Sequence, residues 1–309
     1  MKRNILTLFF ALFAMIRVSA QTYDTLWKQA SAFEQKEQPR SELAVMDKIM
    51  AKAQADRNYG QMLAARLRAV SLWNAVSPDS LAPARQRLVE EMNRTDDPVN
   101  KAVCQAALAR LYREAGNADS AQILFRQALS RPELLSARQS GEFSPLTLQT
   151  TTGKSFDHDL LHLIGYEADT REAYQLMHDY YLKAGRRASA CLCAYQITQK
   201  DRKEDVQLVR KSRYLHTVDS LINVYQDLPE AGELALEHYR FMEGATDASV
   251  ADKITYINYA LNHWGGWPRM NELRNAQREL TNPKLTVENI PLVMRPGQKT
   301  WAQIGRAHV

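Results

Sequence analysis

Two histidines have the spacing of a metal site. His158 and His162 are four positions apart, a spacing that places both side chains on one face of a helix. Asp159 stands where zinc hydrolases with a His-Glu-x-x-His motif carry their general base, and Glu167 is a nearby candidate for a third ligand. Apolar residues flank His162 on both sides, and this setting favours the simpler interpretation of a partly buried side chain that hydrogen-bonds a carbonyl. We therefore expect no metal and no cofactor.

The three cysteines do not form a disulfide framework. Cys191 and Cys193 are two positions apart on a predicted helix, so they point to nearly opposite faces and cannot bond to each other. Cys104 can pair with one of them only if their helices pack together; small core residues in adjacent helices are the simpler interpretation. The sequence also contains no Gly-rich phosphate loop, Ser elbow or Cys/His nucleophile pair, so we predict that the protein is not an enzyme.

The stretch from Ala102 to Leu129 predicts two short amphipathic helices joined by a tight turn. Its packing positions match the spacing of a tetratricopeptide repeat and are Leu108, Tyr112, Gly116, Ala121, Phe125 and Ala128. One such hairpin cannot bury its apolar face alone, so similar neighbours are expected.

A second hairpin with the same pattern spans Tyr174 to Ile197. Its packing positions are Tyr174, Tyr181, Gly185 and Ala190. The two turn glycines are 69 residues apart, close to two repeats of about 34. We predict an all-α fold over residues 21–281, an α-solenoid of tetratricopeptide-like hairpins. The irregular stretch 136–155 inside it is either a contact surface or a simple insertion.

The two ends of the chain differ from this helical region. Residues 1–20 have the basic start, apolar core and small-residue cleavage site of a signal peptide, so the mature chain is expected to be exported and to lack a transmembrane helix. Residues 282–303 have strand-like composition with Pro and Gly punctuation, and predict the first strands of a truncated β domain. Residues 304–309 match the peptide encoded by a common sequencing adapter, and we expect them to be non-native.

The charge balance excludes a nucleic-acid partner. The chain has 40 basic and 35 acidic residues, a net charge of +5. Without the basic residues of the signal peptide and the tail (Lys2, Arg3, Arg17 and Arg306), 36 basic residues face 35 acidic ones, or about +1. The remaining charges are mixed along the chain, whereas a nucleic-acid surface needs clustered, unbalanced Lys and Arg.

Four segments together resemble one family. The export signal ending in SAQ, the opening YDTLWKQA, the run LLHLIGYEA and the closing LTVENIPLVMRPGQKTW are similar to the N-terminal part of bacterial alpha-2-macroglobulin-like proteins of the Bacteroides type. The resemblance implies a helical segment that leads into macroglobulin-like β-sandwich domains, beginning at 282–303. It implies protease trapping in the periplasm or at the outer membrane of a Gram-negative bacterium, with the bait region and any thioester outside this fragment.

The thioester motif of that family is Cys-Gly-Glu-Gln or a near variant. The run from Cys193 to Gln196 shares only its Cys and Gln. Nothing around Cys193 in the sequence would activate the thiol, so no trapping residue is assigned to this chain.

Three hypotheses for the function follow. In the first, the chain is the interaction and scaffold segment of an exported protease inhibitor, and its partners are proteases bound by the full-length protein or downstream domains of the same chain. In the second, it is a free-standing exported tetratricopeptide-like module that binds a protein or a nutrient. In the third, it is a metal hydrolase built on His158 and His162, which the zinc content of purified protein would test.

Overall fold

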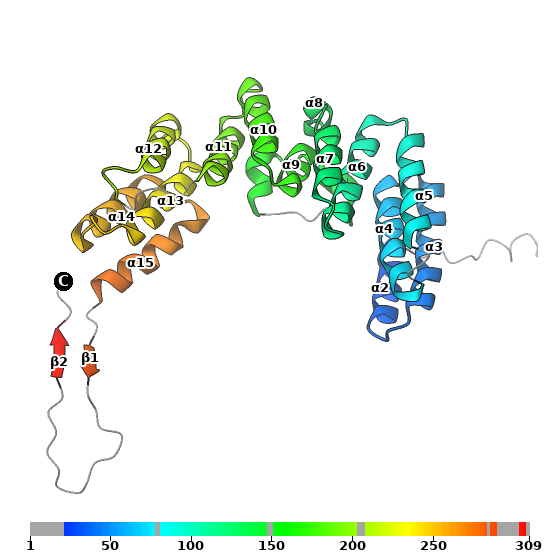
Figure 1. Ribbon diagram of the computed structural model, residues 1–309, viewed down its shortest axis with the longest axis horizontal. Coiled ribbons are helices and arrows are strands. Elements are labelled where there is room, and N and C mark those ends of the chain that lie inside the picture. Colours follow the sequence, from blue (N-terminus) through cyan, green and yellow to red (C-terminus); the bar gives the residue numbers. More distant parts are fainter. Residues whose placement is uncertain are drawn as a thin grey trace, which may run out of the picture. The chain divides into compact units, whose positions relative to one another are not determined.

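The computed structural model describes residues 22–77, 81–146, 151–202, 208–282, 285–288 and 303–306. The predicted signal peptide, residues 1–20, lies outside the described residues. The chain divides into two units, unit 1 (Met1–Ala168) and unit 2 (Asp169–Val309), both built from helices (Figure 1). The all-α prediction for residues 21–281 is therefore confirmed at the level of fold class. The finer arrangement as a solenoid stays a prediction.

The described residues of unit 1 form α-helices and, near its end, two short 3-10 helices. The elements are α2 (Tyr23–Glu34), α3 (Pro39–Asp56), α4 (Tyr59–Val76), α5 (Leu81–Arg94), α6 (Pro98–Glu114), α7 (Ala118–Ala128), α8 (Pro132–Ser136), η2 (Ser140–Phe143), η3 (Thr151–Phe156) and α9 (Leu160–Ala168). Successive helices pack on one another, with α3 against α4 and α6 against α7, and α9 packs on both α6 and α7.

Unit 2 continues with helices and ends in a short β-ribbon. The elements are α10 (Arg171–Lys183), α11 (Arg187–Asp201), α12 (Arg213–Tyr225), α13 (Ala231–Gly244), α14 (Val250–Trp264), η4 (Pro268–Met270), α15 (Asn271–Thr281), β1 (Leu285–Glu288) and β2 (Gln303–Arg306). One hydrophobic cluster contains buried residues from each of the α-helices α11, α12, α13, α14 and α15, among them Ile222, Leu234 and Trp264.

One type of turn connects four of the helix pairs. In each turn a residue with left-handed backbone conformation follows the first helix; these are Glu37 (φ 54°), Arg57 (φ 55°), Gly116 (φ 79°) and Gly185 (φ 73°). The next residue donates its N–H to the carbonyl five residues earlier, which is the hydrogen bond of a Schellman motif. The four bonds are Gln38 N to Phe33 O (3.0 Å), Asn58 N to Ala53 O (2.8 Å), Asn117 N to Tyr112 O (2.9 Å) and Arg186 N to Tyr181 O (2.8 Å).

The two glycine turns are those that the sequence predicts. Their packing residues Leu108, Ala121, Phe125, Ala128, Tyr174, Tyr181 and Ala190 are buried, and Tyr112 is half-buried. The α3–α4 pair has the same turn with Arg57 in place of glycine, and Asn58 caps α4 as Asn117 caps α7. The hairpin architecture thus extends to a pair whose sequence lacks the glycine signal.

The irregular stretch after α8 packs on the helices of unit 1. Phe143 and Phe156 are both buried. A Cβ placed on Gly60, at the start of α4, would lie 2.7 Å from Phe143 Cα, so only glycine allows this close approach of backbone. Gln61 adds a hydrogen bond from its Nε2 to the Ser144 carbonyl (3.1 Å). The described part of the stretch is therefore attached to α4.

The β-ribbon of unit 2 is a two-stranded antiparallel sheet. β1 and β2 pair so that Leu285 faces Arg306 and Glu288 faces Gln303. A pair of strands does not establish a sandwich, so the truncated β domain over 282–303 stays a prediction. β2 includes residues 304–306, and their expected non-native origin likewise stays a prediction.

Candidate interaction site

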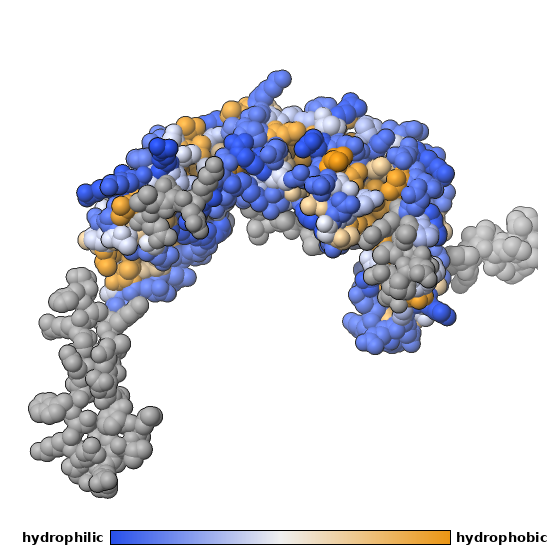
Figure 2. Space-filling view, in the orientation of Figure 1, coloured by the Kyte–Doolittle hydropathy of each residue, from blue (hydrophilic) through white to orange (hydrophobic). Residues whose placement is uncertain are grey.

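A groove in unit 1 runs along α6 between α4 and α9. Its volume is about 570 Å³. Ala106 and Ala107 of α6 line it with small side chains, while α4 contributes Leu67 and α9 contributes Leu163 and Ile164. Figure 2 shows hydrophobic surface among hydrophilic side chains around α4, α6 and α7. The groove offers an apolar surface with room for a partner's side chains.

The charged side chains that line this groove already have partners in unit 1. Arg68 of α4 donates from Nε to the buried carboxylate of Glu42 (2.6 Å) and pairs with Glu34 through Nη2 (2.8 Å). The hydrogen bond to Glu42 raises the pKa of Arg68 above its usual range. On α6, Arg110 donates to Glu114 (2.9 Å), and this bond raises the pKa of Arg110.

Glu167, near the end of α9, is held by Arg113 of α6. Arg113 Nη2 forms an ion pair with the Glu167 carboxylate, and Arg113 Nη1 donates to its backbone carbonyl (2.5 Å). The Arg113 guanidinium also lies over the Phe125 ring, 5.4 Å from its centroid. Glu167 therefore fastens α9 to α6 at one end of the groove, a role different from the metal ligand considered from the sequence.

The expectation that His158 and His162 share a helix face is wrong. α9 begins at Leu160, and His158 lies before it with a left-handed backbone (φ 54°). Asp159 explains the late start, because its Oδ1 accepts the backbone N–H of His162 (2.9 Å) and so caps the first turn of α9. Its carboxylate is buried and does not act as a solvent-facing base.

His162 is part of the core of unit 1. Only 2% of its surface is exposed, and its ring stacks on Phe156 with centroids 4.3 Å apart and also contacts the edge of Tyr166. Within the residues that the structure describes, no three His, Cys, Asp or Glu side chains come together as a metal site would require. The stacked arrangement fits a packing role for this histidine.

The three cysteines are buried side chains on helices. Cys104 is buried in α6, and Cys191 and Cys193 are buried in α11. Burial raises the pKa of the Cys104 thiol to about 11 and raises that of Cys191 above its usual range. Cys193, the candidate thioester position, is a fully buried residue within a helix.

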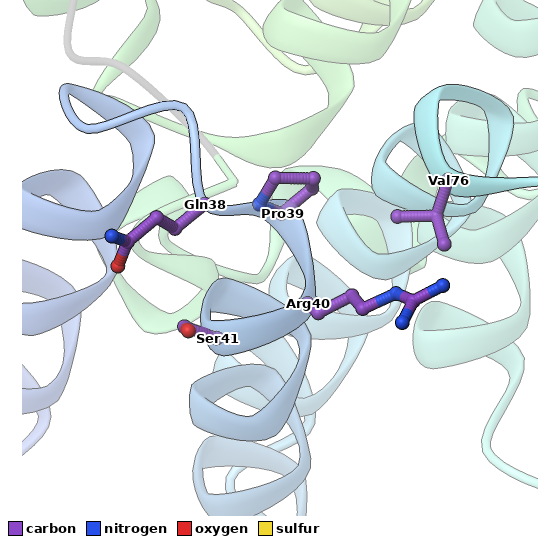
Figure 3. Close-up of a pocket in the computed structure, with 5 residues that line it drawn as sticks. All are labelled: Gln38, Pro39, Arg40, Ser41 and Val76. Atoms are coloured by element: carbon purple, nitrogen blue, oxygen red, sulfur yellow. The ribbon is translucent and has the colours of Figure 1, made fainter.

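A smaller pocket in unit 1 is lined by the turn after α2, the start of α3 and the end of α4. It has a volume of about 400 Å³ and is lined by Gln38, Pro39, Arg40, Ser41 and Val76. In Figure 3 the Arg40 side chain extends toward Val76, while Gln38 and Ser41 lie on the other side of the chain. The lining includes one guanidinium but no carboxylate, histidine or cysteine, so it does not combine a nucleophile with a general base.

Of the groove residues, Glu167 was singled out from the sequence, and for a different role; the apolar lining was not foreseen. The sequence of α6 did carry a signal, because its small and apolar residues are distributed around nearly the whole helix. The structure buries residues on nearly every side: Val99, Ala102, Val103, Cys104, Gln105, Ala106, Leu108 and Ala109. Such a helix has neighbours on several faces. The sequence does not say that two of those neighbours, α4 and α9, leave an open groove between them.

No protein-family model matches the chain, and no curated protein or solved structure matches it significantly. None of the helices among the described residues combines the length and apolarity that a bilayer span requires.

Proposed function

We propose that this chain is a non-catalytic protein-binding scaffold, and that it is the N-terminal interaction segment of an exported alpha-2-macroglobulin-like protease inhibitor. The observation that carries the binding role is the groove along α6 in unit 1. The family assignment rests on the sequence resemblance alone. In that setting the bait region and any thioester belong to segments outside this fragment, and the chain acts in the periplasm or at the outer membrane.

The groove suits the apolar face of an amphipathic helix. Ala106 and Ala107 allow a partner backbone to come close to α6, and Leu67 and Leu163 provide apolar contacts on either side. A helix binds such a groove through apolar side chains at positions i, i+3, i+4 and i+7. The charged residues of the lining are paired within unit 1, so an apolar helix face that enters the groove does not cover an unpaired charge.

A substitution that fills the groove tests the proposal. Ala107 is half-buried and lines the groove, so Ala107→Arg places a long side chain across it. Gln122→Arg adds the same charge at an exposed position of α7 that does not line the groove, and serves as the matched control. Binding is measured by fluorescence polarisation with a labelled helical peptide that carries a leucine stripe at i, i+3, i+4 and i+7, and with a scrambled peptide of the same composition.

The proposal predicts saturable binding of the striped peptide and little binding of the scrambled one. Ala107→Arg should weaken binding by about tenfold or more, because filling the groove removes at least one buried apolar contact of about 1.5–3 kcal/mol. Gln122→Arg should bind like the wild type. Equal affinity for both peptides, or unchanged binding by Ala107→Arg, would remove the groove as a binding site.

A further inference from the structure

A second groove lies within unit 2 and is lined by residues of α10, α11 and α12. These three helices follow one another along the chain (Figure 1). Its volume is about 520 Å³, within the range of about 300–1,000 Å³ that is usual for ligand sites. Ala194 and Ile197 of α11 and Leu221 of α12 form its apolar part. The other seven of its ten lining residues are polar, whereas nine of the fifteen residues that line the groove of unit 1 are apolar.

Nearly all of these polar side chains are engaged with other groups of unit 2. The engaged residues are Gln175, His178, Thr198, Asp201, Tyr214 and Thr217. Asp201, the carboxylate of the lining, accepts a hydrogen bond from Arg171 Nε at 2.6 Å and so has its positive partner. Tyr214 donates to the buried Glu237 (2.8 Å).

Arg213 is the exception. It is the first residue of α12, it is exposed, and it lines the groove. Its backbone is fixed by the cap of α12, where Ser212 Oγ accepts the N–H of Leu215 (3.1 Å). Across the described ranges, the Arg213 guanidinium makes no hydrogen bond and no ion pair. The groove therefore presents one uncommitted cation beside an apolar floor.

We propose that this groove binds an acidic peptide segment in which a Glu or Asp side chain lies next to an apolar one. The carboxylate pairs with Arg213, whose planar guanidinium can hold both carboxylate oxygens, and the apolar side chain covers Ile197 and Leu221. Since the lining carboxylate Asp201 is already paired with Arg171, it does not compete for Arg213. This site lies in unit 2 and does not depend on the groove of unit 1.

The test uses two labelled peptides on the intact chain, one of alternating Leu and Glu and one of alternating Leu and Gln. The wild type should bind the Leu/Glu peptide about tenfold more tightly, because a charge-assisted pair with Arg is stronger than an amide contact. Arg213→Gln should lose this preference. Arg126→Gln removes the same charge from an exposed position of α7 and should keep it.

Three results would overturn the proposal. The first is the absence of saturable binding of the Leu/Glu peptide to the wild type. The second is equal loss of preference in Arg213→Gln and Arg126→Gln, which would indicate a net-charge effect. The third is displacement of the peptide by free glutamate at a concentration comparable to that of the peptide, which would assign the groove to small carboxylates. Circular dichroism checks that Arg213→Gln remains folded, as an exposed site should.

Discussion

The contact between Gly60 and Phe143 gives the sharpest test of how unit 1 is assembled. A Cβ at position 60 would lie 2.7 Å from Phe143 Cα, 2.8 Å from its carbonyl carbon and 3.0 Å from its carbonyl oxygen. These are backbone atoms, so the contact cannot be relieved by rotating a side chain. In Gly60→Ala either the segment around Phe143 or the start of α4 must shift.

The magnitude follows from two opposing effects. Overpacking of this kind costs about 1–3 kcal/mol, whereas replacing a helix glycine with alanine gains about 0.5–1 kcal/mol. Because Gly60 is the second residue of α4, the alanine gain is at most about 0.5 kcal/mol there. We therefore expect Gly60→Ala to lower the free energy of unfolding by about 0.5–2.5 kcal/mol, or to lower Tm by roughly 1–10 °C in a unit of this size. Leu146 follows the same segment and lines the groove of unit 1, so binding of the striped helical peptide should weaken as well.

Gly244→Ala is the matched control, because a Cβ at that helix position meets no atom within 4 Å. It should leave stability unchanged or raise it slightly. Urea unfolding followed by circular dichroism measures both variants, and hydrogen exchange of the α4 amides places the effect in unit 1. A Gly60→Ala protein as stable as Gly244→Ala would refute the close approach.

Three further predictions concern the N-terminal cap of α6, the histidine pair and the buried Cys104. Asp97 Oδ1 accepts the backbone N–H of Val99 (2.9 Å) and Asn100 (2.8 Å), so Asp97→Ala should lower the free energy of unfolding by about 1 kcal/mol in a urea titration, and no loss would contradict the cap. His162→Ala should cost about 2 kcal/mol or more through lost core packing, while His158→Ala stays within about 0.5 kcal/mol; equal losses that a chelator reproduces would instead support a metal site. Burial raises the pKa of the Cys104 thiol to about 11 in the folded state, against about 8.5 in the unfolded chain. As the pH rises, the unfolded chain therefore loses this proton first. The stability that the neutral thiol contributes is complete below about pH 8.5 and is lost as the pH rises toward 11. Cys104 should accordingly react slowly with a thiol reagent at pH 8 until urea unfolds the chain, and rapid labelling of the native protein would contradict its burial.

The hairpin turns show which part of the fold was readable in the sequence. Gly116 and Gly185 mark their turns because glycine adopts a positive φ without strain, and the apolar spacing on either side predicts the helices. Glu37 and Arg57 adopt the same conformation in equivalent turns. Their positions escaped the pattern because other residues can enter this region at a modest cost when the surrounding contacts support it.

The histidine pair shows why the candidate site could not be settled by spacing. The i, i+4 argument holds only inside a helix, and the buried cap at Asp159 places His158 outside it. The grooves depend on contacts between segments distant in the chain, such as Leu67 of α4 and Ile164 of α9. Local periodicity marks which faces are apolar, but not which of them another helix leaves uncovered.

We propose that this chain is the helical scaffold at the start of an alpha-2-macroglobulin-like inhibitor, and the most direct test of that proposal is to sequence the source gene beyond the codon for Trp301. We expect an open reading frame that continues through several β-sandwich domains of about 100 residues each. A stop codon shortly after Trp301 would contradict it and would leave a free-standing helical-hairpin binding protein.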